Sequence, residues 1–217
     1  MKTVKYTGYL YVVFVRSMTG ISKITRKFVD YEYTHMSLCF DNHMEDFVTF
    51  ARRNLYTPLD AGIVWERRGN YAFEDMEACK VKIFKIPVTK EEFQEIVELI
   101  EEFEQDEEYM FNLFSMLTMP VLHGFSIYKA HNCMSFISMI LTKIHGIYLE
   151  KPYYKYMPSE LNEVLKEYVW FEGWLKKKEE SVTAKADSIP GRWEMCVVNC
   201  RIIAELIYRM IRYPVYK

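Results

Sequence analysis

A single cysteine separates a polar run from an apolar, periodic segment in residues 128–144, YKAHNCMSFISMILTKI. Apolar residues then recur at helical spacing, which predicts a helix with one buried face. Asn132 is a good N-cap residue, so we expect Cys133 in the first helical turn. There, unpaired backbone N–H groups and the helix dipole favour the thiolate, which is the nucleophilic form. Cys133 is therefore a candidate nucleophile, and a small buried core residue is the alternative interpretation.

A histidine opens a second informative segment, residues 33–41, YTHMSLCFD. Large residues such as Met36 and Leu38 alternate with His35 and two small residues, which predicts a strand with two different faces. The small residues would let a helix pack closely beside the imidazole. We therefore expect His35 to act as the general base for Cys133. A histidine bound to a backbone carbonyl at a sheet edge is the alternative.

These two blocks resemble the circularly permuted papain-like cysteine hydrolases, the permuted branch of the NlpC-type superfamily that includes the YaeF/YiiX-like proteins. In that branch a Thr-His-x-Ser strand precedes an Asn-Cys-x-x-Phe helix, as residues 34–37 and 132–136 do here. A bacterial subgroup also has Phe-Gly-Arg and Pro-Leu-x-Ala-Gly segments, similar to residues 50–52 (FAR) and 58–62 (PLDAG). Met134 departs from the pattern, because many relatives have an aromatic or small residue beside the cysteine.

The resemblance implies an α+β, permuted papain-like fold, in which the cysteine-bearing helix packs on a central, mostly antiparallel sheet. It also implies a hydrolase or amidase that cleaves an amide or peptide bond, in cell-wall peptide or an acylated small molecule. Other permuted members resemble lipid acyltransferases, so thioester or lipid acyl transfer by the same Cys133–His35 pair is one alternative. A non-catalytic binding module that keeps the fold is another, since fold does not determine function.

A papain-like site uses a third polar residue to orient the imidazole. By the resemblance it should lie on the strand predicted over residues 47–52, where Thr49 is the polar residue among apolar neighbours. Thr49 is therefore the expected third catalytic residue. Glu45 is the stronger orienting group chemically, but it falls in the predicted turn.

Four residues are candidates for substrate binding: Arg52, Tyr128, Asn132 and Tyr154. Arg52 could bind a substrate carboxylate bidentately, or pair with Glu66 or Asp60 to hold a loop predicted over residues 54–69. Tyr154 lies in a tyrosine-rich segment that could cover the groove or simply pack. His131 precedes the cysteine closely, and we expect it on the surface.

Residues 181–192 read as a linker, which divides a permuted papain-like domain (1–180) from a C-terminal extension (181–217). The helix predicted over 193–212 has a wide apolar face, so we expect it to dock on the body or to form a homodimer. A membrane-surface helix is the lesser alternative.

Elsewhere in the chain, strands are expected over 9–16, 80–88 and 168–175, and a short helix over 21–29. Two further helices are expected to begin at the Thr89–Glu92 capping box and at Pro158.

Composition limits the partners of the chain. The net charge of −2 gives no field that would recruit nucleic acid. Five cysteines without a CxxC pair indicate neither a disulfide framework nor a zinc site, and no metal or cofactor is expected. No apolar run is long enough to span a bilayer. We therefore expect a cytoplasmic protein that takes a small peptide or an acyl-containing substrate.

Overall fold

The computed structural model describes residues 4–16, 31–53, 57, 59–71, 77–176 and 191–213. The helix expected over residues 21–29, Pro58 and most of the linker at 181–192 lie outside the described residues.

The centre of the molecule is a six-stranded sheet with the order β4-β3-β2-β1-β5-β8, in which every neighbouring pair is antiparallel. The strands are β1 (Tyr9–Val15), β2 (His35–Cys39), β3 (Asp46–Arg52), β4 (Ala61–Arg67), β5 (Ala78–Pro87) and β8 (Val169–Lys176). A short parallel pair joins β6 (Met110–Phe111) to β7 (Ala130–His131). The fold is therefore α+β with a mostly antiparallel sheet, as expected.

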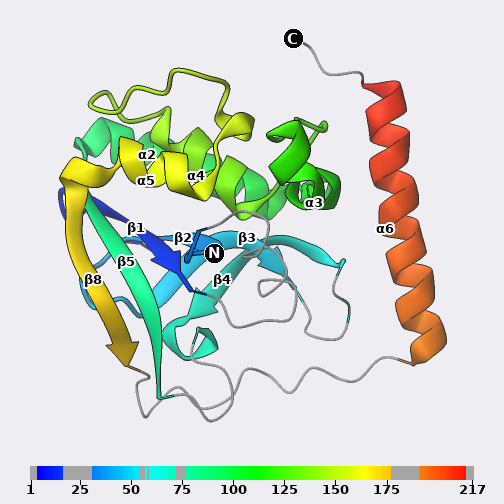
Figure 1. Cartoon of the computed structure of the whole chain (residues 1–217), viewed down its shortest axis with the longest axis horizontal. Helices are drawn as coiled ribbons and strands as arrows, with labels where there is room; N and C mark the ends of the chain where they lie inside the picture. The colour runs from blue at the N-terminus through cyan, green and yellow to red at the C-terminus, as the bar shows by residue number, and fades with distance from the viewer. Residues whose placement is uncertain are drawn as a thin grey trace.

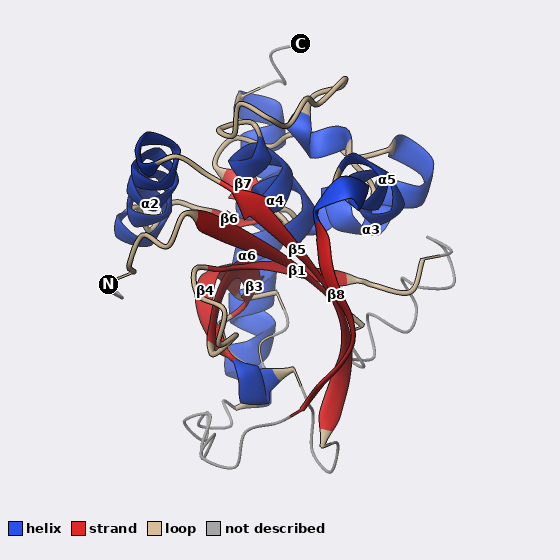
Figure 2. Cartoon of the chain, turned by 90° about the vertical axis from the view of Figure 1, so that its left-hand side faces the viewer, coloured by secondary structure: helices blue, strands red, loops and turns tan. Residues whose placement is uncertain are grey.

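A layer of helices lies over the sheet: α2 (Lys90–Gln105), α3 (Leu113–Leu122), α4 (Cys133–Leu141) and α5 (Pro158–Val164) (Figure 1). The C-terminal α6 (Arg192–Arg212) stands beside this layer, at the margin of the molecule (Figure 1). Short 3-10 turns are η1 (Arg68–Asn70), η2 (Tyr153–Lys155) and η3 (Lys166–Tyr168). Helices α2, α4 and α5 lie on the same face of the sheet (Figure 2). Among the residues that the structure describes, no helix is both long and apolar enough to cross a membrane.

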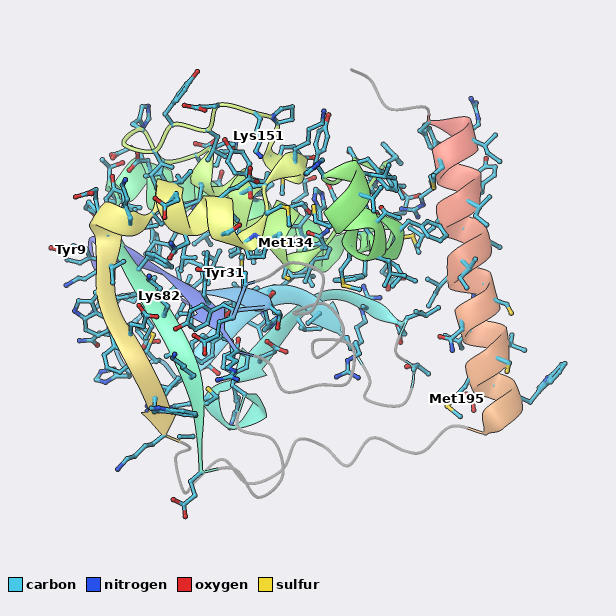
Figure 3. The ribbon with its side chains drawn as sticks, viewed as in Figure 1. Tyr9, Tyr31, Lys82, Met134, Lys151 and Met195 are labelled. Carbon is cyan, nitrogen blue, oxygen red and sulfur yellow. The ribbon has the colours of Figure 1, made fainter. Side chains whose placement is uncertain are left out.

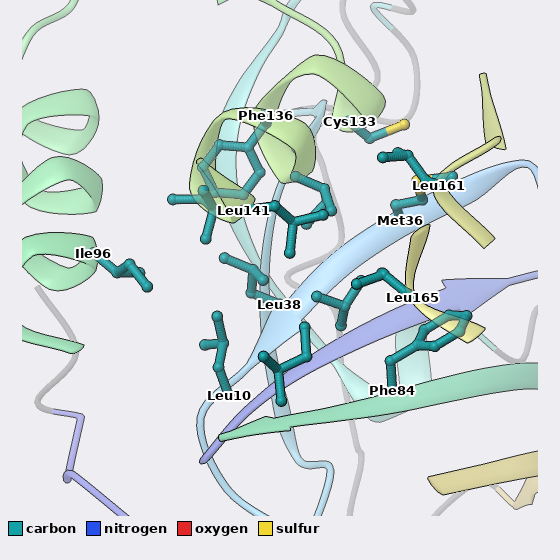
Figure 4. Close-up of a cluster of buried hydrophobic side chains, with 14 of the residues drawn as sticks. Leu10, Met36, Leu38, Phe84, Ile96, Cys133, Phe136, Leu141, Leu161 and Leu165 are labelled. Carbon is teal, nitrogen blue, oxygen red and sulfur yellow. The ribbon is translucent and has the colours of Figure 1, made fainter. Parts of the chain in front are cut away.

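The main core lies between this helical layer and the sheet. Met36 and Leu38 of β2 and Phe136 of α4 all point into it, as strand alternation and helical periodicity require (Figure 4). Met134 is buried in the same cluster, between helix and sheet (Figure 3). The Met134 side chain therefore serves packing.

The opposite face of β2 differs from the expectation. Ser37 and Cys39 point away from the helices, into a second cluster, where Tyr71 covers them. The small residues therefore make room for a tyrosine and not for the cysteine helix, which packs on the large apolar face of the strand.

The loop expected over residues 54–69 contains a strand. β4 pairs along its whole length with β3, and Glu66 lies opposite Phe47. The run Ile63-Val64-Trp65 is β-branched and aromatic, which favours a strand in spite of the proline and glycines around it. This strand matters because it carries Glu66, whose carboxylate contacts His35.

Candidate active site

Cys133 is the first residue of α4, at the place where the sequence predicts it. The Asn132 side chain accepts from the Ser135 backbone N–H (2.8 Å), and Ser135 Oγ accepts from the Asn132 backbone N–H (3.0 Å). This reciprocal capping box fixes the start of the helix. The cysteine is buried, with 7% of its surface exposed, and its side chain leaves the helix beside Leu161 (Figure 4).

His35 is the first residue of β2, and its side chain links two other groups. Nε2 lies 2.9 Å from Oε2 of Glu66. The side chain of Cys133 also interacts with the imidazole and helps to raise the pKa of His35. Cys133 and His35 are thus close enough to interact.

The structure does not support Thr49 as the third residue of the site. The Thr49 hydroxyl donates to the backbone carbonyl of Met36 (2.6 Å), inside the sheet, and Thr49 is completely buried. Its hydroxyl is used to satisfy the main chain, so Glu66 and not Thr49 orients the ring. A carboxylate differs from a hydroxyl in its chemistry, because it also stabilises the charged imidazolium.

His35 and Glu66 each stabilise the charged form of the other. Burial alone would lower the pKa of His35, but the Glu66 carboxylate, together with the hydrogen bond and charge of Cys133, raises it to about 10. Burial likewise would raise the pKa of Glu66, yet the charge and hydrogen bond of His35 hold it below the usual range. At neutral pH the site therefore contains an imidazolium and a carboxylate.

Tyr71 supports the carboxylate from the far side. Its hydroxyl donates to Ser37 Oγ (2.9 Å) and also interacts with Glu66, which helps to lower the pKa of that carboxyl group. Burial, and then the charge of Glu66, raise the pKa of Tyr71 well above its ordinary value. The phenol therefore stays protonated and remains a donor. Its ring also stands edge-on to His35, with 5.8 Å between centroids.

The expected substrate residues are placed in different ways. Arg52, at the end of β3, contributes to the lowered pKa of Glu66, which agrees with the alternative that it compensates this carboxylate. Its neighbour Arg53 is the residue that pairs with Asp60 (3.3 Å). Asn132 is fully buried as the helix cap, so its amide serves the fold.

The two expected tyrosines, Tyr128 and Tyr154, differ in their surroundings. Tyr128 is 45% exposed and stacks on Tyr213, with 4.4 Å between centroids. Tyr154 is half-buried, stands edge-on to Tyr153 and belongs to η2, which packs against α4. Only Tyr154 therefore lies on an element that contacts the cysteine helix directly.

The expectation that His131 lies on the surface is wrong. It is 7% exposed and surrounded by the rings of Phe50, Phe103, Tyr109 and Tyr153. Burial lowers the pKa of His131 to about 4, so it is neutral at physiological pH. The rings that enclose it come from four separate segments, and the sequence around residue 131 does not reveal them.

Glu66 and Tyr71 are the site residues that the sequence pattern misses. A signal for Glu66 exists in the β-branched run before it, which places the carboxylate on a strand that can pair with β3.

Within the described residues, no group of three His, Cys, Asp or Glu side chains could hold a metal ion. Comparisons of the chain with protein-family models, with curated proteins and with solved structures find no match.

Proposed function

We propose that Cys133, His35 and Glu66 are the catalytic group of a cysteine hydrolase that cleaves an amide or peptide bond. The observation that carries the proposal is that one imidazole lies 2.9 Å from a carboxylate and interacts with a cysteine in the first turn of a helix. A nucleophile, a base and a group that orients the base are the parts that nucleophilic catalysis by cysteine requires.

Each group has a defined role in the proposed reaction. The Cys133 thiolate attacks the carbonyl carbon, and the backbone N–H groups at the start of α4 stabilise the oxyanion. His35, held as imidazolium by Glu66, gives its proton to the leaving amine as the C–N bond breaks. The neutral imidazole then takes a proton from water, whose oxygen attacks the thioester. The acid is released, and the proton on His35 and the thiolate are restored.

The permuted papain-like identity belongs to the same proposal. It is supported by the order of the histidine strand and the cysteine helix in the chain, and by the mostly antiparallel sheet on which that helix packs. The resemblance favours cell-wall peptide or an acylated small molecule as the substrate.

The test is the capture of an acyl-enzyme. We expect an activated ester, such as a p-nitrophenyl acyl ester, to release a burst of p-nitrophenol equal to the protein present, and peptide mapping to find the acyl group on Cys133. Cys133→Ala should abolish the burst and His35→Ala should slow it. A folded protein that gives no burst, or one that Cys133→Ala leaves intact, would refute the proposal and favour a binding module.

A second candidate, acyl transfer, is favoured by the surface of α3. Leu117, Val121 and Leu122 are exposed on this helix, to 59%, 78% and 56%, and offer an apolar surface for an acyl chain. The two candidates share the acyl-enzyme and differ in the acceptor. Adding an amine or alcohol acceptor to the burst experiment separates them, because a transferase forms the acylated acceptor in preference to the free acid.

A further inference from the structure

One face of α6 is held against the body of the protein. Ile202 and Leu206 pack in a cluster with Ile127 and Ala130, and Leu206 is fully buried. The same side of the helix, one turn further on, carries Arg209.

Arg209 fixes the rotation of the helix about its axis. Its Nη1 donates to the backbone carbonyls of Glu108 (2.8 Å) and Tyr128 (3.2 Å), and its Nε donates to Glu205 (2.7 Å). A buried guanidinium satisfied by main-chain carbonyls allows little freedom of orientation. The side of α6 that faces away from the body is therefore well defined.

A row of apolar and small residues follows this outer side, and we call it the α6 seam. Its members are Trp193, Val197, Cys200, Ala204, Ile207 and Ile211. At about 100° per residue, the seam lies on the side of the helix opposite Leu206. All six residues are exposed, Trp193 to 81% and Ile211 to 76%. The helix stands at the margin of the molecule, and its end at Met195 projects beyond the body (Figures 1 and 3).

The spacing of the seam indicates a helical partner. Its members are separated alternately by four and three residues along the whole helix. This is the spacing of a coiled-coil seam, in which positions a and d insert into holes on a second helix. The face that α6 turns to the body already satisfies its tertiary packing, so the seam is a separate, second apolar stripe.

The charges on α6 argue for a protein partner over a lipid surface. Glu194, Arg201, Glu205 and Arg212 form a polar stripe between the two apolar ones, with both signs equally present. Helices that lie in a membrane surface carry mainly Lys and Arg on the polar face. A mixed stripe gives little attraction to anionic lipid, and the net charge of −2 means that two copies of the chain repel only weakly.

The area is sufficient for association of two copies. A fully exposed aromatic side chain offers about 150–250 Å², and the adjoining Tyr208 is also exposed, to 55%. With the aliphatic members, two seams facing each other would bury on the order of 1,000 Å², which is the lower bound for a specific interface.

We propose that α6 is a dimerisation helix, and that the α6 seam packs against the same seam of a second copy of this chain as a parallel two-stranded coiled coil. An isologous contact of this kind closes as a two-fold dimer. The parallel orientation follows from Arg201, which flanks the seam. In an antiparallel pair it would face Arg201 of the second copy, whereas in a parallel pair it lies beside Cys196.

The test compares two neighbouring substitutions in the full chain. Ile211→Glu places a carboxylate in the seam, and Arg212→Glu places the same side chain on the polar stripe. By sedimentation equilibrium we expect the wild type and Arg212→Glu to be dimers, and Ile211→Glu to dissociate at least ~100-fold more readily, because an unpaired charge would be buried. Circular dichroism checks that both variants are folded. Ile207→Glu should repeat the effect of Ile211→Glu.

Other results would overturn the proposal. A wild-type chain that stays monomeric, or a dimer that Ile211→Glu and Ile207→Glu leave intact, excludes the α6 seam as the interface. If the wild-type chain is a monomer that co-sediments with phosphatidylcholine–phosphatidylserine vesicles, and Ile211→Glu abolishes this co-sedimentation, the α6 seam binds lipid.

The orientation has its own measurement. In a parallel pair Cys200 faces Cys200 of the second copy, so in a Cys196→Ser background copper–phenanthroline oxidation should link the two chains, and a further Cys200→Ser change should prevent it. A dimer that Ile211→Glu dissociates but that forms no Cys200 link would overturn the parallel arrangement.

Discussion

The carboxylate of Glu66 and the imidazole of His35 meet at 2.9 Å although their strands are not neighbours: β3 lies between β2 and β4 in the sheet. The contact therefore depends on the twist of three strands together. It also determines the charge of the site, because Glu66 is the main group that raises the pKa of His35.

Removing the charge of Glu66 should reduce the reactivity of Cys133. In Glu66→Gln the imidazolium loses its carboxylate, so the pKa of His35 falls and less of the ring is charged beside the sulfur. We expect the rate of Cys133 alkylation by iodoacetamide near pH ~6 to fall by ~10-fold or more, since one pKa unit is a factor of ten. The other cysteines are replaced so that a single thiol is measured.

Thr49→Val is the matched comparison. It removes the hydroxyl that donates to Met36 and should cost about 1 kcal/mol of unfolding free energy, with the pH profile of alkylation unchanged. A profile that moves with Thr49→Val and not with Glu66→Gln would return the orienting role to Thr49.

The charged state of His35 should appear in the stability of the protein. Its pKa is raised in the folded state to about 10, against ~6.5 in an unfolded chain, so the folded protein binds this proton more tightly. The resulting stabilisation is complete below pH ~6.5 and is lost as pH rises to about 10. Urea unfolding across this interval should show a loss of at least about 2 kcal/mol, and His35→Gln should flatten it. If the unfolding free energy has the same slope against pH in the wild type and in His35→Gln, His35 is not the group responsible.

His131 should have the opposite dependence. Its folded pKa of about 4 lies below the unfolded value of ~6.5, so the unfolded chain takes up the proton first. Stability should therefore fall as pH drops from ~6.5 to about 4, by on the order of 2–3 kcal/mol. His131→Phe keeps an aromatic ring in the same cage and does not titrate, so it should lose less over this range. NMR titration of the imidazole provides a direct check.

Glu92 connects the start of α2 to the segment after α4. It accepts from the backbone N–H groups of Thr89 (2.7 Å) and His145 (2.8 Å). Burial would raise the pKa of Glu92, but these hydrogen bonds lower it to about 2. Glu92→Gln should cost about 2 kcal/mol at neutral pH, because hydrogen bonds to a charged group are lost. The exposed neighbour Glu91 provides the control: Glu91→Gln should change the unfolding free energy by less than ~0.5 kcal/mol.

The sequence predicts those parts of the site that depend on local patterns. The cap at Asn132 and the helix from Cys133 follow from residues within one turn, and the alternation after His35 places it on a strand. Glu66 does not follow, because its reach to His35 depends on the register and twist of strands that the pattern of either segment does not contain. Thr49 has the expected polarity, yet its hydroxyl donates to the backbone carbonyl of Met36 in β2.

The position of β4 at the end of the sheet order has a consequence for how the site can be lost. Edge segments open at a lower free energy than the whole fold, and Glu66 belongs to such a segment. A brief detachment of β4 would withdraw the carboxylate and leave a neutral imidazole beside the sulfur, while the core under α4 stays intact. The reactivity of Cys133 then reports whether β4 is paired with the rest of the sheet. We expect this reactivity to be lost before the protein unfolds.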